Sequence, residues 1–297
     1  MKNVRGILEI GILAISTASS LIACGPKYDS SMPDSPLEIV ESSEGIIGGS
    51  VVDSTDPLSQ STVALMDISS GSLCTGTIVA SNLVLTAAHC TSSDPTSTVV
   101  IFSTTLPDSI YDIMGKTIRH VVGGKASPLW AKLQNNQEKN WGDIALLKFS
   151  GKLPEGFKPA RLLNSKKSLK DGMLAVLAGF GLMDGVKKTE SSEMRKTTVS
   201  IQSVHFSETE VMFDQSKGKG ACHGDSGGPA YVTIGGKSAL MGVTSRGIND
   251  PRDTCGVSSI YTSVSAHMSW LKSTAAELMS PKYKPEPIAQ PANFFSL

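Results

Sequence analysis

The pattern that most constrains this chain is a succession of short β-rich runs. Each run holds four to nine residues rich in β-branched, aliphatic or aromatic side chains, and Gly, Pro, Asn, Asp or Ser separates it from the next. Because no helices alternate with the runs, antiparallel sheets are favoured over parallel ones. We therefore expect an all-β fold made of two antiparallel six-stranded β-barrels packed face to face. The twelve runs form two sets of six: 62–68, 77–80, 83–86, 98–102, 116–122 and 144–149, then 173–178, 196–204, 210–213, 230–234, 239–244 and 259–264.

Only one segment after the last run has helical character. Residues 265–278 place Met268, Leu271, Ala275 and Leu278 on one apolar face, which predicts a C-terminal helix. The remaining residues, 279–297, are rich in proline, and we expect a tail that ranges from extended to disordered.

The N-terminus has the features of an export signal. Positive charges at Lys2 and Arg5 precede an apolar stretch, so residues 1–23 are expected to be a signal peptide. The stretch ends in Leu-Ile-Ala-Cys, which resembles a bacterial lipobox, and this makes Cys24 a candidate for lipidation. The alternative is an ordinary signal peptide with an incidental cysteine. Residues 24–45 are rich in Ser, Pro, Asp and Glu and are expected to form a propeptide or linker.

Charge and cysteine usage narrow the classes of function. The 27 basic and 27 acidic residues cancel and form no long run of either sign, so we expect no nucleic-acid partner. Export implies an oxidising destination. If Cys24 carries a lipid, four cysteines remain, and these could close two bridges in three different ways. Their spacings are not those of a zinc site, so no metal or cofactor is expected.

Three short blocks contain the residue types that nucleophilic catalysis needs. They are Thr-Ala-Ala-His-Cys at 86–90, Gly-Asp-Ile-Ala-Leu-Leu at 142–147 and Gly-Asp-Ser-Gly-Gly-Pro at 224–229. A serine hydroxyl becomes a nucleophile when a base accepts its proton, and an imidazole can do so near neutral pH. A carboxylate on the other ring nitrogen orients the imidazole. Glycines beside the serine allow backbone N–H groups to approach a developing oxyanion.

Together these blocks, in the order His, Asp, Ser, resemble the trypsin/chymotrypsin family of serine proteases over Ile46 to about Leu278. The resemblance implies a protease domain over 46–278, with barrel one at about 46–155, barrel two at about 156–264 and the helix at 265–278. It implies His89 as general acid and base, Asp143 as the orienting carboxylate and Ser226 as nucleophile. The N–H groups of Gly224 and Ser226 would form the oxyanion hole.

The same resemblance implies two disulfides and an activation step. Cys74 would pair with Cys90, and Cys222 with Cys255. Ile-Ile-Gly-Gly at 46–49 resembles the mature N-terminus of the family, where a freed ammonium pairs with the aspartate before the nucleophile; here these would be Ile46 and Asp225. The alternative is that 46–49 simply begins a strand. Because Gly45 and Glu44 precede the cut in place of a Lys or Arg, another protease, or an unusual self-cleavage, is expected to make it.

Substrate preference is expected from the residues that the resemblance places around the specificity pocket. Gly220 would lie at its base, with Ser245, Gly247 and Ser259 around it, and none of these brings a negative charge. A basic substrate side chain would lack a partner there, so cleavage after apolar residues is expected. Two departures from the family are Arg246, where a Trp is usual, and Thr75, where a Gly is usual.

The sequence thus predicts an exported bacterial serine endopeptidase, made as a zymogen, that acts on proteins or peptides through an acyl-enzyme. The precursor would be periplasmic or anchored in the outer membrane by a lipid on Cys24. The activated, monomeric enzyme would be secreted. The alternative is a catalytically silent homologue that serves as a binding module.

Overall fold

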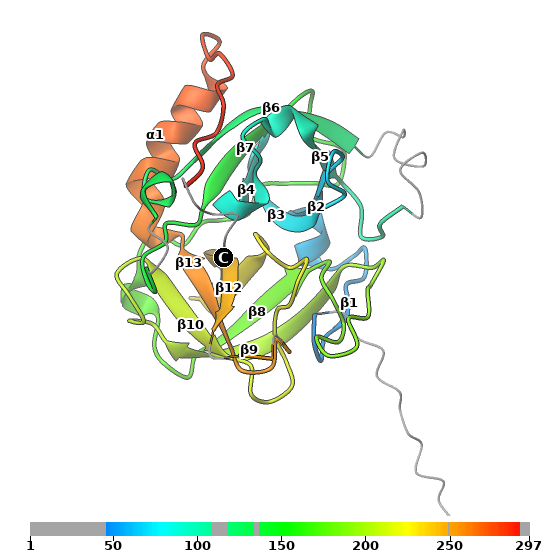
Figure 1. Ribbon diagram of the computed structural model, residues 1–297, viewed down its shortest axis with the longest axis vertical. Coiled ribbons are helices and arrows are strands. Elements are labelled where there is room, and N and C mark those ends of the chain that lie inside the picture. The colour runs from blue at the N-terminus through cyan, green and yellow to red at the C-terminus, as the bar shows by residue number, and fades with distance from the viewer. Residues whose placement is uncertain (1–45, 108–117, 134–136, 249, 253, 292–297) are drawn as a thin grey trace, which may run out of the picture. The chain divides into compact units, whose positions relative to one another are not determined.

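The computed structural model describes residues 46–107, 118–133, 137–248, 250–252 and 254–291 (Figure 1). The expected signal peptide, lipidation site and leader at 1–45 lie outside the described residues. In the part of the chain that the structure describes, no helix has both the length and the apolar character needed to cross a membrane.

The first six strands after the short N-terminal strand close into a barrel with the order β2-β3-β4-β7-β6-β5. Every pairing is antiparallel, and β5 returns to β2 to close the ring. The strands are β2 (Thr62–Asp67), β3 (Leu73–Ala80), β4 (Leu83–Thr86), β5 (Thr98–Ile101), β6 (Ile118–Ala126) and β7 (Ala145–Phe149).

The second barrel follows the order β9-β10-β13-β12-β11-β8, and β8 pairs with β9 to close it. A two-residue strand, β1 (Ser50–Val51), pairs antiparallel with part of β9. The expected all-β fold with two antiparallel six-stranded barrels is confirmed. The strands are β8 (Leu174–Gly179), β9 (Arg195–Ser203), β10 (Glu210–Asp214), β11 (Pro229–Ile234), β12 (Lys237–Ile248) and β13 (Ser258–Ser263).

Each barrel has its own core, and a third apolar cluster joins the two barrels. Phe102 and Phe149 meet edge to face inside the first barrel, and Phe213 and Tyr261 do so inside the second. The joining cluster combines side chains of β4 and β7 with side chains of β11 and β12. Burial of this shared apolar surface fixes one barrel against the other, and it places the loops between them in defined positions.

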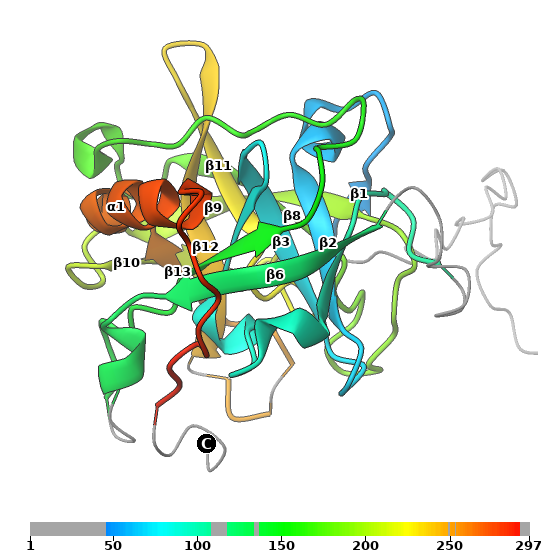
Figure 2. The same cartoon turned by 90° about the horizontal axis from the view of Figure 1, so that it is seen from above.

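The helix α1 (Met268–Met279) follows the second barrel in sequence and packs against the first (Figures 1 and 2). Its buried side chains include Leu271 and Leu278, both on the predicted apolar face. Lys148 Nζ on β7 donates to the carbonyl oxygen of Leu278 at 2.7 Å, so it satisfies a carbonyl that the last turn leaves unpaired. The predicted C-terminal helix is therefore present.

The proline-rich tail, as far as Pro291, is extended and docked on the first barrel. Ile288 is 3% exposed and belongs to that barrel's core. Two adjacent glycines in β6 leave room for Tyr283 and Ile288 of the tail. A Cβ on Gly123 would lie 2.5 Å from the Tyr283 hydroxyl oxygen, and a Cβ on Gly124 would lie 3.2 Å from Ile288 Cδ1. Figure 2 shows the segment crossing β6. The expected disorder does not extend to the described part of this tail.

We predict that Ile288→Ala lowers the free energy of unfolding by about 2–4 kcal/mol, because it leaves a cavity in the core of the first barrel. Urea denaturation measures the change. The matched control is Val186→Ala, since that valine is 73% exposed and should change stability by less than about 0.5 kcal/mol. Equal, small effects of both substitutions would show that the tail does not contribute to the core.

Candidate active site

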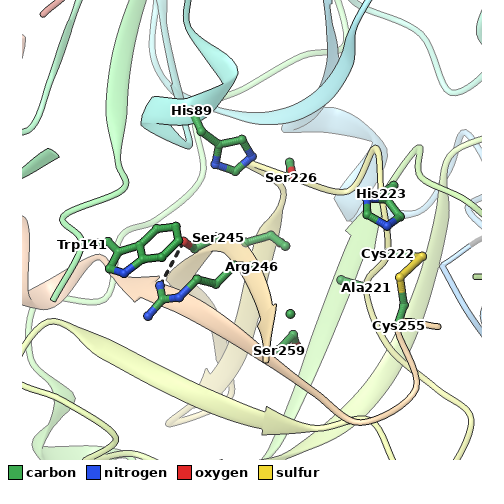
Figure 3. Close-up of a pocket in the computed structure, with 12 residues that line it drawn as sticks. His89, Trp141, Ala221, Cys222, His223, Ser226, Ser245, Arg246, Cys255 and Ser259 are labelled. Carbon is green, nitrogen blue, oxygen red and sulfur yellow. Dashed lines mark hydrogen bonds between the residues drawn. A yellow bond between two sulfur atoms is a disulfide. The ribbon is translucent and has the colours of Figure 1, made fainter. Parts of the chain in front are cut away.

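A cavity of about 420 Å³ lies where the two barrels meet. One wall carries His89 from the first barrel, and the remaining walls come from the second barrel and from the loop before β7 (Figure 3). The sequence-predicted residues Ser226, Ser245, Gly247 and Ser259 all line it. Residues that are remote in sequence therefore converge on one space.

Asp143 is the electrostatic centre of this arrangement, although it has no exposed surface. Its Oδ2 lies 2.7 Å from His89 Nδ1 and accepts the Ser245 hydroxyl at 2.7 Å, while its Oδ1 accepts the His89 backbone N–H at 3.0 Å. Burial acts to raise the pKa of this carboxyl, but His89 and the hydrogen bonds hold the pKa below its usual range. Asp143 is thus ionised at neutral pH.

Local backbone geometry explains how a carboxylate reaches this buried position. Gly142 has φ +63°, and a Cβ there would lie 2.3 Å from the Cβ of Leu129, so no other residue fits. On the other side, Thr262 Oγ1 in β13 donates to the Asp143 carbonyl oxygen at 2.9 Å. Both barrels therefore fix the backbone of Asp143.

His89 lies in a short 3-10 turn, Ala88–Cys90, between β4 and the next loop. Burial acts to lower the pKa of its imidazole, but the Asp143 carboxylate raises that pKa above the ordinary value. Because Nδ1–H donates to Asp143, Nε2 remains as the proton acceptor. Ser226 shares the cavity with this ring, and among the described residues no hydrogen bond joins the Ser226 hydroxyl to it (Figure 3). Such bonds often form only when substrate binds.

The loop that holds Ser226 is bent by two glycines with positive φ, Gly224 at +92° and Gly227 at +79°. A Cβ on Gly227 would lie 2.0 Å from Thr86 Oγ1, so the loop packs directly on the first barrel. Within the described chain the N–H groups of Gly224 and Ser226 have no hydrogen-bond partner. They are available as donors to an oxyanion.

Thr75 supports this loop from β3. Its Oγ1 donates to the Gly224 carbonyl oxygen at 3.0 Å and accepts from the Phe180 N–H at 3.3 Å. Its backbone N–H donates to the Ser226 carbonyl oxygen at 2.8 Å. The sequence marked Thr75 only as a departure from a familiar glycine. Its supporting role depends on contacts between barrels that sequence spacing does not reveal.

Asp225 is a second buried carboxylate, and its surroundings differ from those of Asp143. It accepts hydrogen bonds from the backbone N–H groups of Gly181 at 2.8 Å and Cys222 at 2.9 Å. Among the described residues no cation lies within ion-pair distance, and burial raises its pKa to about 7. Ile46 is also buried, at 1% exposure, in the core of the same barrel.

Two disulfides frame the site with the pairing that the resemblance implied. Cys74–Cys90 ties β3 to the histidine turn, and Cys222–Cys255 ties the serine loop to the segment before β13. His89 lies near the first pair and His223 near the second, in groups with the spacing of metal ligands. Cysteines in a disulfide lack the thiolate that a metal binds, so these groups do not form a metal centre.

Gly220, the residue expected at the base of the cavity, is not among its lining residues. The Gln215 side chain fills the adjacent space, because a Cβ on Gly220 would lie 2.1 Å from Gln215 Cδ. The Gln215 amide accepts from the Ala221 N–H and donates to the carbonyl oxygens of Ala221 and Cys255. Gln215 is a residue that sequence reasoning missed, and its polar atoms are already paired.

Arg246 does not leave a free charge in the cavity wall. Its guanidinium stacks 4.1 Å from the centroid of the Trp141 ring, and Nη1 donates to Glu210 Oε1 at 2.8 Å. Glu210 is fully buried and also accepts the N–H groups of Asn140 and Trp141. The aromatic surface of this wall therefore comes from Trp141, which also lines the cavity (Figure 3). Sequence reasoning missed Trp141 because it lies far from Arg246 along the chain.

A second cavity of about 490 Å³ lies on the other side of His89. The loops around the Cys74–Cys90 disulfide line it, and Gln290 of the tail contributes to its wall. Among the described residues, His89 alone lines both cavities.

Comparison with known proteins gives a consistent result. The chain is 29% identical to duodenase-1 of Bos taurus over 68% of this chain and 78% of the relative. It is 27% identical to trypsin Blo t 3 of Blomia tropicalis over 88% and 97%, respectively. It is 28% identical to chymotrypsin-like elastase family member 1 of Macaca fascicularis over 84% and 95%. The family model described as Trypsin matches residues 46–271. This chain therefore belongs to the trypsin family of serine proteases.

Proposed function

We propose that this chain is a serine endopeptidase in which Ser226 attacks the peptide carbonyl. His89 Nε2 accepts the hydroxyl proton as Oγ bonds to the carbonyl carbon, and the N–H groups of Gly224 and Ser226 stabilise the oxyanion. The imidazolium then donates that proton to the departing amine, which leaves an acyl-enzyme for water to hydrolyse. The observation that carries the proposal is the 2.7 Å contact of His89 with Asp143 beside Ser226 in one cavity.

The rival function, a silent binding module, is disfavoured by the details of the site. Asp143 is held ionised and raises the pKa of the imidazole, which is what a general base needs. The two candidate oxyanion donors keep free N–H groups within the described chain. A binding module would gain nothing from either feature.

For the substrate, we propose cleavage after apolar residues. The described cavity lining contains no carboxylate, and the Gln215 amide behind it is satisfied by backbone groups. A cationic side chain would lose its hydration without gaining a partner. The names of the relatives do not decide the point, because they include trypsin, chymotrypsin and elastase. The argument therefore rests on the residues of the cavity.

For activation, we propose that another protease cuts after Gly45 and frees the ammonium of Ile46. Asp225 has the properties of an acceptor for that charge: it is buried, it lacks a described cation, and its pKa is raised to about 7. Ion pairing would favour its charged form and stabilise the loop that holds Ser226. The uncut chain would then be a zymogen.

For organisation and location, we propose a signal peptide at 1–23, a propeptide at 24–45 and a monomeric protease domain at 46–278. The relatives reported above are animal proteins, so a bacterial lipoprotein rests only on the motif that ends at Cys24. If that cysteine is lipidated, cutting at Ile46 releases the enzyme from its anchor, because no cysteine in 25–45 could keep the leader attached.

The release proposal predicts that the form beginning at Ile46 appears in the soluble fraction, while the uncut form stays with membranes. Fractionation followed by N-terminal sequencing tests this. The control is Cys24→Ser, which should move the uncut form away from the membranes. Processed enzyme found only in membranes would contradict the proposal.

The catalytic proposal predicts that a fluorophosphonate labels the form beginning at Ile46 and that Ser226→Ala abolishes labelling. His89→Ala should reduce kcat by about a million-fold, because the hydroxyl loses its base. Ser273→Ala, in the exposed part of α1, is the matched control and should label like the natural chain.

A peptide library should show cleavage after apolar residues. An inert processed form would favour the binding module, and preferred cleavage after Arg would refute the proposed specificity.

Asp225 should make the stability of the uncut chain depend on pH. Its folded pKa of about 7 exceeds the value of about 3.9 in unfolded chains, so the folded state holds more protons between these values. Its contribution to stability is therefore complete below about pH 4 and is lost as the pH rises through about 7. Urea unfolding of the Ser226→Ala precursor, with and without Asp225→Asn, measures this contribution.

The processed form should show the opposite trend, because the Ile46 ammonium favours the charged carboxylate. Relative to Asp225→Asn, its stability should rise over the same pH range. A falling profile in both forms would show that Ile46 does not pair with Asp225.

A further inference from the structure

The tail after α1 lies beyond the residues that the family model matches, and its last described residues contact the segment that follows the histidine turn. The Ile288 side chain anchors the tail in the first barrel, and its N–H donates to the Ser93 carbonyl oxygen at 3.0 Å. Tyr283 adds a second anchor, with Lys148 Nζ 5.2 Å from the centroid of its ring. These contacts place Gln290 beside the segment that follows His89.

Both the nitrogen and the oxygen of the Gln290 side-chain amide form hydrogen bonds. Nε2 donates to the Thr91 carbonyl oxygen at 2.9 Å and to Thr91 Oγ1 at 3.2 Å. Oε1 accepts the indole N–H of Trp130 at 3.0 Å. The contacts are consistent in direction, because Thr91 Oγ1 donates its own proton to the Ala88 carbonyl oxygen at 2.7 Å. One side chain therefore joins two segments that are separate in sequence.

Both segments lie next to the turn that holds His89. Thr91 closes the histidine turn, since its N–H and its hydroxyl both donate to the carbonyl oxygen of Ala88. Trp130 is fully buried against Ala88, and its ring centroid lies 6.5 Å from that of His89. The neighbouring Leu129 packs against Gly142, the residue before Asp143. A change at Gln290 would therefore reach the segments next to both His89 and Asp143.

We propose that Gln290 is a positioning residue, which holds the histidine turn through Thr91 and Trp130 and so sets the direction of the His89 ring toward Ser226. The proposal rests on the proposed serine-protease function. Catalysis depends on the geometry between base and nucleophile, and small displacements reduce the rate steeply. Substrate contacts in the first cavity do not involve Gln290. The predicted signature of its loss is a lower kcat with little change in KM.

The first test is Gln290→Met in the form beginning at Ile46, because Met keeps the length of the side chain and removes its hydrogen bonds. We expect kcat to fall about tenfold, with KM for a substrate that occupies only the first cavity unchanged within about twofold. Lys284→Ala, which changes an exposed tail residue, is the matched control and should leave both constants unchanged. An unchanged kcat, or a rise in KM alone, would overturn the proposal.

The second test asks whether the effect passes through Thr91. Thr91→Val removes the hydroxyl and should lower kcat, whereas Thr91→Ser keeps the hydroxyl and should restore it. Thr91→Val keeps the 2.9 Å bond to the Thr91 carbonyl oxygen, so the cycle isolates the Thr91 hydroxyl. If part of the effect passes through that hydroxyl, Gln290→Met should cost less in the Thr91→Val background than in the natural chain. If the double variant lowers kcat by the product of the two separate effects, a route through the Thr91 hydroxyl is contradicted.

A third measurement does not depend on activity. In the inactive Ser226→Ala chain, Gln290→Met should speed hydrogen exchange at the Cys90 and Thr91 amides, which bond to Ala87 and Ala88. Unchanged exchange would refute the positioning role. If the natural processed chain fails to react with a fluorophosphonate, the proposed function fails, and the exchange result still decides whether Gln290 holds the turn.

Discussion

The burial of one charge, on Asp143, is the constraint on which the arrangement of both barrels around the site depends. A carboxylate with no exposed surface is costly unless donors surround it. The first barrel supplies the imidazole and backbone N–H of His89, and the second supplies the Ser245 hydroxyl. Neither barrel alone completes the set, so the charge is compensated only when the two are correctly packed. The apolar cluster between the barrels provides that packing, and the Cys74–Cys90 disulfide keeps the histidine turn beside it.

Two buried carboxylates in one site behave differently because their partners differ. Asp143 faces an imidazole, and its pKa falls below the usual range, whereas Asp225 receives only two backbone N–H groups, and its pKa rises to about 7. Burial acts on both in the same direction, so the difference comes from His89 and from the side-chain hydrogen bonds of His89 and Ser245, for which Asp225 has no counterpart. In the proposed mechanism the first carboxylate serves catalysis as it stands. Under the proposed activation, the second would gain its partner only when the chain is cut, and this would give a zymogen a chemical basis.

Local pattern predicted the elements of the fold well, because strand and helix periodicity is a property of neighbouring residues. Each of the twelve β-rich runs overlaps a strand, and the helix begins and ends within three residues of its expected bounds. Contacts between distant segments could not be predicted in this way. Gln215 behind the cavity, Trp141 on Arg246 and Thr75 under the serine loop all depend on how two barrels meet. The docked tail had one available signal, since adjacent glycines at Gly123 and Gly124 inside a strand mark a close approach of another segment.

Of the two departures from the family, Arg246 lies in the wall of the cavity, and its charge is compensated locally. Replacing an aromatic wall residue by Arg246 would place a positive charge beside the substrate. The buried Glu210 neutralises that charge, and Trp141 covers the guanidinium with an aromatic face. The electrostatic character of the wall is thus preserved although the residue that forms it has changed. The proposed apolar specificity is supported by this compensation more directly than by the small residues around the cavity, because an unpaired Arg246 would have favoured acidic substrates whatever the shape of the cavity.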